Sequence, residues 1–376
     1  MFVIWGATYT VMDIPYWAML PSLAFTEKER NGISSVARVC LGIGGLIVVV
    51  AAPFFVDRLF GMTNPRGYLV AAVIVSAAFF ALMAATAVLI REKYSIPVSR
   101  AKLRDIFKIF GKNKQLRWYM LFVVLIHTAM MITTTFAVYF FTYDLRNFAL
   151  SGVFAAVAGL GYGVGMAAYS LVCKKLGARK TFLFSVAAVG IGYLLMFAAT
   201  AALYDSLAYD PYGIPIFRMS PAGLGAFVLI AVCGMSGFVG FGMLTVSATV
   251  MLADITDYHE WKFKERSDGI IISMQPFLSK VSGAVAALIT GIGLVFITGA
   301  FVIDAEHNID EIIYAMPSYG ILLLRLLMFA VPLVLVTVSF FLYRSKYKIV
   351  GEYKDQMVAE LQNLRQAEGV EPRDPE

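Results

Sequence analysis

The sequence is poor in charged residues and in cysteine. Charged residues occupy only 15% of its 376 positions, whereas apolar residues occupy 60%; soluble globular domains carry roughly 25% charged residues. A mean hydropathy of +0.76 argues against a soluble protein, because so much apolar surface cannot be hidden in one core. The three cysteines, Cys40, Cys173 and Cys233, lie inside apolar runs. They predict small buried side chains and argue against a disulfide framework or a zinc site.

Apolar runs long enough to cross a bilayer recur along most of the chain. A transmembrane helix needs about 20 predominantly apolar residues, and the runs of this length predict about nine helices. They cover residues 1–24, 34–55, 67–90, 118–142, 150–173, 181–204, 223–251, 269–298 and 317–343. The predicted fold class is therefore all-α, a polytopic bundle of membrane helices.

The distribution of basic residues predicts the orientation of the chain. The net charge of +6 does not indicate a nucleic-acid partner, because Lys and Arg lie between the apolar runs. They concentrate in 91–117, 174–180, 262–266 and the tail, whereas 299–316 has acidic residues and no Lys or Arg. Since cytoplasmic loops carry the excess of Lys and Arg, we expect a multi-pass protein of the cell inner (plasma) membrane with a cytoplasmic C-terminus.

The basic segment 91–117 divides the chain unevenly, with about three spans before it and about six after it. Many secondary transporters consist of two six-helix halves joined by a long cytoplasmic loop. On that template about three N-terminal helices are absent; the alternative is a genuine N-terminus on the outside. We expect a remnant of an N-terminal bundle at 1–90, a basic cytoplasmic linker loop at 91–117, a C-terminal six-helix bundle at 118–343 and a partly helical cytoplasmic tail at 344–376.

Asp13 lies deep inside the first apolar run. It is about eleven residues, or about 16 Å, from the cytoplasmic end of this helix, where a charge costs roughly 2.5–3.5 kcal/mol. Thr10, Asp13 and Trp17 have the i, i+3, i+7 spacing of one helix face. A carboxylate accepts hydrogen bonds from sugar hydroxyls, and an indole packs on the C–H face of a sugar ring. The alternative is a neutral Asp13 that is hydrogen-bonded to a neighbouring helix.

Two other predicted spans contain basic side chains that could belong to the same sugar site as Asp13. Lys280 lies in the middle of 269–298, with Gln275 just over one turn before it, and Arg38 lies about one turn inside 34–55. With Asp13, Lys280 and Arg38 form the smallest set for a buried charge network that a cation or a proton could disturb. Arg38 can instead snorkel to the cytoplasmic surface.

Two further ionisable residues lie inside apolar runs. Arg325 is in the last span, and the sequence suggests no role for it. His127 could relay a proton, but a single histidine in a membrane helix is more often a packing residue. We therefore leave both residues out of the predicted site.

The loop predicted at 252–268 contains four residues that could ligate Mg²⁺, as in membrane prenyltransferases: Asp254, Asp257, His259 and Glu260. Such an enzyme would need a second acidic cluster to hold diphosphate, and none occurs at another predicted cytoplasmic helix end. The simpler interpretation is that the acidic side chains pair with basic loop residues and hold one conformation closed.

The run Tyr9–Trp17, with Met12-Asp13-Ile14-Pro15 in its middle and Arg38 after it, resembles the fourth and fifth helices of one family. This family is the glycoside-pentoside-hexuronide:cation symporters, the melibiose-carrier-like family of the major facilitator superfamily. Phe136–Tyr143 resembles the seventh helix, and Met251–Tyr258 resembles the loop after the tenth. Lys174–Lys180 is a degenerate form of the loop motif common to the superfamily. The resemblance extends from Tyr9 to Tyr343, in the same order.

The resemblance implies symport of a sugar or glycoside with Na⁺ or H⁺ in a lipid bilayer, with no cofactor and no catalytic residue. The roles it implies are sugar binding for Asp13, Trp17 and Arg38, sugar or charge-network contacts for Gln275 and Lys280, a cation site at Thr10, and a cytoplasmic gate at Asp254 and Asp257. The family's cation-binding aspartates lie on its second helix, which the chain does not match. We therefore expect little or no cation-driven uptake from the chain as it stands.

Other functions stay open at the level of the sequence. A carrier of the same superfamily could move a lysolipid or another amphiphile, in which case a cavity with an apolar slot open to lipid is expected. A membrane prenyltransferase would use Asp254 and Asp257 with Mg²⁺. A third alternative is a remnant that does not transport.

Overall fold

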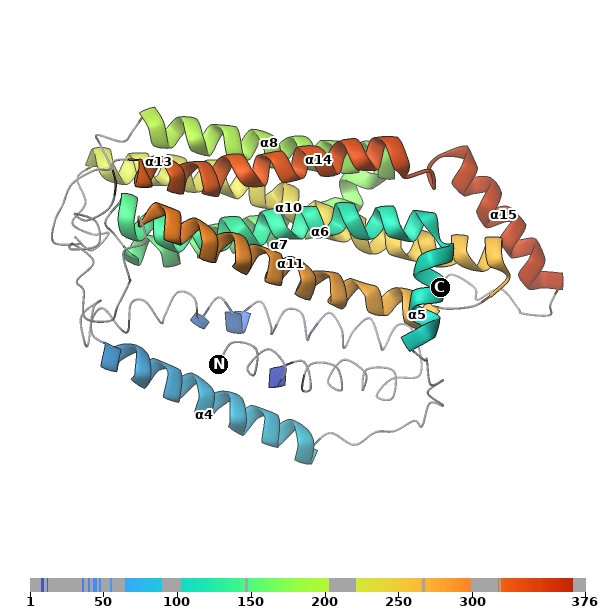
Figure 1. Cartoon of the computed structure of the whole chain (residues 1–376), viewed down its shortest axis with the longest axis horizontal. Helices are drawn as coiled ribbons and strands as arrows, with labels where there is room; N and C mark the ends of the chain where they lie inside the picture. Colours follow the sequence, from blue (N-terminus) through green and yellow to red (C-terminus); the bar gives the residue numbers. More distant parts are fainter. Residues whose placement is uncertain are drawn as a thin grey trace. The chain divides into compact units, whose positions relative to one another are not determined.

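The structure is a computed structural model in which the chain divides into two units, residues 1–100 and 101–376. Regular structure in the described part of both units is helical (Figure 1). The described residues are 65–89, 103–145, 148–202, 221–265, 268–298, 317 and 319–367, with the isolated positions 8, 9, 12, 36, 40, 43–45, 47, 48 and 55.

Seven helical runs among the described residues are long and apolar enough to cross a membrane. The first unit contributes α4 (Pro65–Leu89). The second contributes α6 (Lys114–Tyr139) with η1 (Phe140–Asp144), α7 (Phe148–Leu176), α8 (Ala178–Ala202), α10 (Pro221–Phe263), α11 (Asp268–Ile297), and the run of α13 (Gly320–Arg325), η3 (Leu326–Ala330) and α14 (Val331–Lys346). The all-α membrane class is thus confirmed. The expected spans 1–24 and 34–55 lie largely outside the described residues, so the total of about nine stays a prediction.

Two shorter helices lie beside the membrane-spanning runs of the second unit. The amphipathic helix α5 (Leu103–Lys112) precedes α6, so the second half of the basic segment 91–117 is helical. The tail helix α15 (Glu352–Ala367) follows α14 and buries Met357 and Leu361, one turn apart, on one face. Both helices lie at the end of the second unit where α6 begins and α14 ends (Figure 1).

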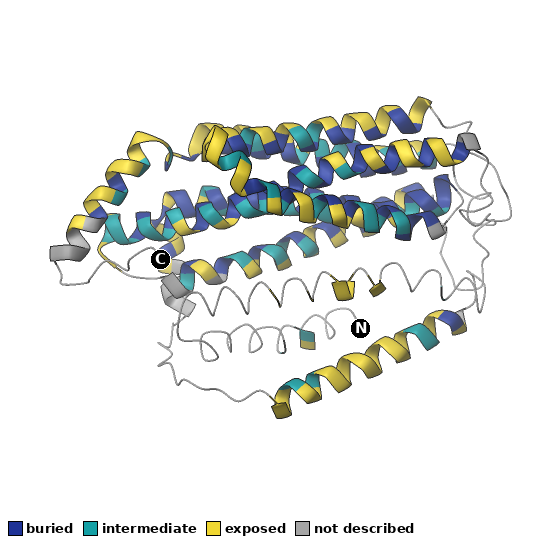
Figure 2. Cartoon of the chain, turned by 180° about the vertical axis from the view of Figure 1, so that it is seen from behind, coloured by how far each residue is buried: buried dark blue, intermediate teal, exposed yellow. Residues whose placement is uncertain are grey.

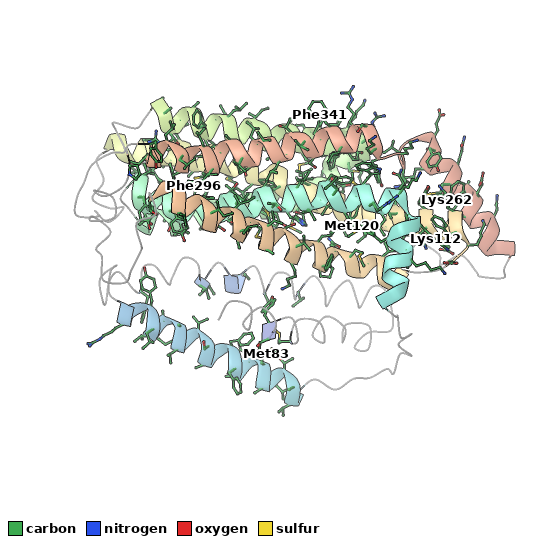
Figure 3. The ribbon with its side chains drawn as sticks, viewed as in Figure 1. Met83, Lys112, Met120, Lys262, Phe296 and Phe341 are labelled. Carbon is green, nitrogen blue, oxygen red and sulfur yellow. The ribbon has the colours of Figure 1, made fainter. Side chains whose placement is uncertain are left out.

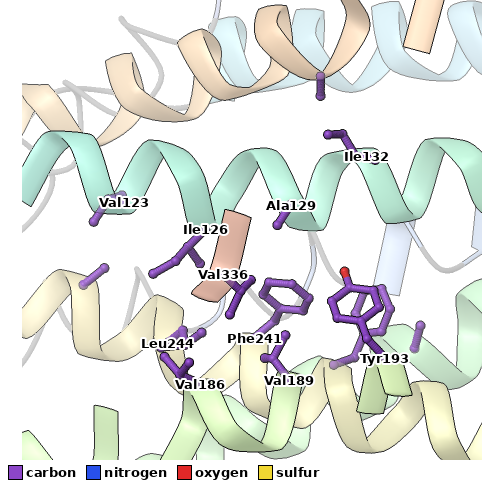
Figure 4. Close-up of a cluster of buried hydrophobic side chains, with 14 of the residues drawn as sticks. Val123, Ile126, Ala129, Ile132, Val186, Val189, Tyr193, Phe241, Leu244 and Val336 are labelled. Carbon is purple, nitrogen blue, oxygen red and sulfur yellow. The ribbon is translucent and has the colours of Figure 1, made fainter. Parts of the chain in front are cut away.

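The core of the second unit forms where α10 packs along α7 and α8, and where α14 and α11 pack against α6. Buried faces of these helices point toward one another and exposed faces point outward (Figure 2). Figure 4 shows one part of this core, in which α6, α8 and α10 contribute Ile126, Ala129, Val186, Val189, Phe241 and Leu244. Close packing of this kind holds each helix in one rotational setting.

Glycine lets α10 approach its two neighbours closely. A Cβ atom at Gly165 of α7 would overlap the backbone of Val239 on α10, and one at Gly242 of α10 would overlap the backbone of Tyr162 on α7. Small residues at such crossings are typical of membrane helices, because association there depends on close van der Waals contact. The α7–α10 crossing therefore brings Tyr162 against α10.

The helix α10 is longer than the sequence indicates. We expected its span to end at residue 251 and a loop to follow from 252, but α10 continues to Phe263. That expectation was wrong because the additional turns bury Leu252, Ile255 and Tyr258 in the core, and this packing stabilises the helix beyond its apolar run. Asp254 and Asp257 therefore lie on the last turns of a helix.

Many apolar side chains lie on the outer surface of the second unit. Phe296 of α11 and Phe341 of α14, both labelled in Figure 3, are 62% and 61% exposed. Lipid solvates such surfaces, so an apolar sequence does not imply burial within the protein. Burial, expected for all three cysteines, holds for Cys233, whereas Cys173 is partly exposed and Cys40 is exposed.

Candidate functional site

A pocket of about 300 Å³ lies between α6, α7 and α10. Its volume is at the lower end of the range for small-molecule sites, about 300–1,000 Å³. We call it the apolar pocket, because most of its walls come from side chains such as Met130, Phe154 and Phe238. Three residues that carry hydroxyl groups, Thr134, Ser151 and Tyr162, also line it.

A row of hydrogen-bonded polar side chains begins at this pocket. The Tyr162 hydroxyl donates to Oγ1 of Thr245 (3.0 Å), and the Gln275 amide on α11 donates to Oγ1 of Thr249 (2.9 Å). On α10, Phe238, Thr245 and Thr249 have i, i+7, i+11 spacing, which places them on one helix face over about 16 Å. We call Tyr162, Thr245, Thr249 and Gln275 the hydroxyl strip; it runs from the apolar pocket along α10 toward α11.

Gln275, which we predicted to bind substrate, belongs to this strip through its hydrogen bond to Thr249. Lys280, also on α11, is exposed within the second unit. Its side chain leaves the helix about 140° away from that of Gln275, so the two residues face different directions. The other predicted sugar and cation residues lie outside the described residues, and their roles stay predictions: Thr10, Asp13, Trp17 and Arg38.

Asp254, predicted to belong to a cytoplasmic gate, pairs with the tail helix. Its carboxylate lies 2.6 Å from Nζ of Lys354 on α15. A second contact joins the same helices, because the Trp261 indole donates to Oε2 of Glu360 at 2.8 Å. Burial, with the Asp254 carboxylate nearby, raises the pKa of the Tyr347 hydroxyl well above its usual value. The partner of Asp254 thus comes from the C-terminal tail and not from the neighbouring loop.

The helix α5 and the start of α6 lie at the same end of the second unit, where Figure 3 labels Lys112 and Lys262. Lys108 and Lys112 lie 3.8 and 3.5 Å from Oε1 of Glu265. The Asn113 side chain caps α6 by accepting from the Leu116 amide at 3.0 Å. The two ion pairs attach α5 to the residues that follow α10.

The four residues proposed as Mg²⁺ ligands do not converge. Within the described part of the chain, no group of three His, Cys, Asp or Glu side chains is placed to hold a metal ion. The α-helical conformation of this segment explains the arrangement, because positions 254, 257, 259 and 260 leave α10 in several directions. His259 is fully buried, and its Nδ1 lies 3.3 Å from the Asn113 amide.

Sequence reasoning missed an ion pair at the opposite end of the second unit. Arg325 donates from Nε and Nη2 to the two carboxylate oxygens of Asp144, at 2.7 and 2.9 Å. The Asp144 side chain is fully buried. Asp144 is the last residue of the π-helical segment η1, and Arg325 is the last residue of α13, directly before the π-helical segment η3. The signal in the sequence is weak: Asp144 follows the predicted span 118–142, Arg325 lies inside the span 317–343, and nothing local connects the two residues.

Residues 1–350 match the family described as MFS/sugar transport protein. The chain belongs to this family. This membership confirms the major facilitator resemblance and identifies the chain as a multi-pass membrane protein of a carrier family. Because the family consists of transport proteins and not of enzymes, the prenyltransferase hypothesis is rejected.

Several named carriers are similar in sequence to this chain, at 23–26% identity. A raffinose carrier protein of Pediococcus pentosaceus is 24% identical over 367 residues, which cover 94% of this chain and 52% of the carrier. A lactose permease of Lactobacillus delbrueckii subsp. bulgaricus is 23% identical, with 96% and 55% covered. An isoprimeverose transporter of Lactiplantibacillus pentosus is 26% identical, with 80% and 58% covered. The chain thus spans about half the length of these curated relatives.

Proposed function

We propose that this protein acts in secondary active transport, as a symporter of a sugar or glycoside with Na⁺ or H⁺. It would lie in the cell inner membrane with a cytoplasmic C-terminus. The observation that carries the proposal is the hydroxyl strip, in which hydroxyl and amide groups from three membrane helices form a row beside a pocket. Such groups both donate and accept hydrogen bonds, as sugar hydroxyls do. The named activities of the relatives support the same substrate class.

In this mechanism the sugar exchanges its hydrogen bonds with water for bonds to the strip. The amide of Gln275 and the hydroxyls of Thr249 and Tyr162 already bond within the strip, so each can turn to a ligand without being left unsatisfied. The cation would bind the carboxylate of Asp13 and so disturb the charge network that Asp13, Lys280 and Arg38 are predicted to form. This change would shift the balance between open and closed states, and the two helix bundles would then rock about the sugar.

The contacts between α10 and α15 would form part of the cytoplasmic gate. The Asp254–Lys354 pair and the Trp261–Glu360 hydrogen bond hold the tail helix on the last turns of α10. A rocking motion that moves the end of α10 must carry α15 with it or break these contacts. Since partly exposed ion pairs contribute only about 1 kcal/mol or less, they can open and close during transport.

Binding of sugars to the whole chain in lipid nanodiscs tests the proposal. Isothermal titration with raffinose, lactose and isoprimeverose should show binding of at least one of them. Thr249→Ala should weaken that binding about tenfold, since a lost hydrogen bond to a ligand is worth about 1–1.5 kcal/mol. Asp13→Ala should abolish it, because a carboxylate makes stronger, charge-assisted bonds.

Thr337→Ala is the matched control for this experiment. Like Thr249, Thr337 is an exposed threonine whose hydroxyl bonds the carbonyl four residues before it, but it lies on α14, away from the strip. It should bind sugar with unchanged affinity. If Thr249→Ala and Thr337→Ala bind equally well, the sugar does not use the hydroxyl strip.

A further inference from the structure

The apolar pocket and the hydroxyl strip differ in chemistry but share one residue. Tyr162 lines the pocket, and its hydroxyl donates to Oγ1 of Thr245 in the strip. Phe238 lines the pocket from the same face of α10 that carries Thr245 and Thr249. A ligand that crosses this point would have its polar part along the strip and its other part in the pocket.

The pocket itself suits an apolar group better than a second sugar ring. Phe154, Phe238 and Met130 offer ring and thioether surfaces, while the hydroxyl groups number few for its volume. A sugar ring brings several hydroxyls, and each hydroxyl buried without a partner weakens binding by about fivefold or more. A flat aromatic ring or a short alkyl chain has no such requirement and packs favourably against aromatic walls.

We propose that the apolar pocket binds the aglycone of a glycoside, so that the preferred substrates are aryl or alkyl glycosides. The inference rests on the proposed function, because the sugar itself is assigned to the hydroxyl strip. It goes further by dividing the substrate into a polar glycone on α10 and α11 and an apolar aglycone between α6 and α7. Removing roughly 80 Å² of apolar surface from water would strengthen binding about 30-fold.

Matched pairs of glycosides in lipid nanodiscs test this division by titration calorimetry. Each pair has one glycone and either a methyl or a 4-nitrophenyl aglycone; the glycones are α-galactose, β-galactose and α-xylose. The 4-nitrophenyl member of a pair that binds should bind about 30-fold more tightly. Equal affinity within every pair that binds would overturn the inference while leaving the proposed function standing.

Substitutions that fill the apolar pocket test whether the tighter binding of 4-nitrophenyl glycosides arises there. Gly159 lines the pocket, and a Cβ built there meets no side chain and no other helix within 4 Å, so Gly159→Leu adds a side chain at the pocket with no clash at its Cβ. It should remove the difference between the two members of a pair; Ala155→Leu, one turn away on the same wall, should do the same. Gly225→Leu on α10 is the control: its Cβ is equally free, and it lies about 20 Å along the helix from Phe238.

The remaining outcomes decide against the inference in different ways. A 4-nitrophenyl preference that survives both Gly159→Leu and Ala155→Leu would show that the aglycone binds elsewhere. Binding of none of the six glycosides would overturn the inference; the proposed function would fall with it only if raffinose, lactose and isoprimeverose also fail to bind. Binding of lysophosphatidylethanolamine that Gly159→Leu abolishes, without binding of any glycoside, would assign the pocket to a carrier of amphiphiles instead.

Discussion

Asp144 and Arg325 are a pair of charges held inside a bundle that lipid surrounds. They are separated by 181 positions in the sequence and meet through two parallel hydrogen bonds, a geometry that matches the guanidinium group to the carboxylate. Such a pair does not by itself stabilise a protein, because removing both charges from water offsets their attraction. Each buried charge instead needs the other as its hydrogen-bonding partner, so the loss of one leaves the other unpaired.

Replacing one member of this pair should therefore destabilise the protein strongly. We expect Arg325→Met to lower the free energy of unfolding by about 3–5 kcal/mol, because Asp144 would be left buried without a partner. The double variant Asp144→Leu with Arg325→Met should recover most of this loss. The measurement is thermal unfolding of the detergent-solubilised protein. A double variant as unstable as Arg325→Met would show that packing and not charge controls this end of the bundle.

At the scale of elements, the crossing of α7 with α10 positions the candidate site. The two helices meet where Gly165 and Gly242 leave no room for a side chain. The same crossing places the Tyr162 hydroxyl against Thr245. Backbone contact between the helices thus sets the distance between the pocket wall on α7 and the hydroxyls on α10. A change in this distance should therefore alter both the apolar pocket and the hydroxyl strip.

Adding a single methyl group at the crossing tests this dependence. Gly165→Ala should lower the free energy of unfolding by about 1–3 kcal/mol, because α10 has to move away from the new Cβ atom. Gly163→Ala, two residues earlier on α7, has no atom within 4 Å of its Cβ and should be neutral or slightly stabilising. Thermal unfolding of the two variants side by side provides the measurement. Equal midpoints would mean that the helices are not in backbone contact at Gly165.

At the scale of the whole molecule, basic residues mark one end of the second unit. Lys108, Lys112 and Lys262 lie at this end, together with the tail helix α15 and its Lys354. The opposite end carries Tyr319 and the Asp144–Arg325 pair, across a run of 27 residues. Because Lys and Arg favour the cytoplasmic side, the end with α15 should face the cytoplasm.

Labelling of single cysteines can decide this orientation. After replacement of Cys40, Cys173 and Cys233 by alanine, Tyr319→Cys should react with a membrane-impermeant maleimide in intact cells, because Tyr319 is 55% exposed at the outer end. Lys348→Cys, exposed after the end of α14, should react only after the cells are opened. The reverse pattern would place the C-terminus outside.

The sequence alone determined the all-α membrane class, the family and, to within a few residues, the positions of most spans from α4 to α14. Apolar runs have to match the thickness of the bilayer whatever their neighbours are, so length and composition are enough. Gln275 was also predicted as a site residue, from a resemblance, and the structure joins it to Thr249.

Only the tertiary structure decided which faces of these helices meet. Asp144 forms an ion pair with Arg325, Asp254 forms one with Lys354, and Tyr162 donates a hydrogen bond to Thr245. Nothing in the local sequence connects the members of any of these pairs. An apolar helix has no clear polar face to indicate its rotation. Close packing around glycine and aromatic residues sets that rotation instead, so the pocket and the hydroxyl strip appear only when all the helices are assembled.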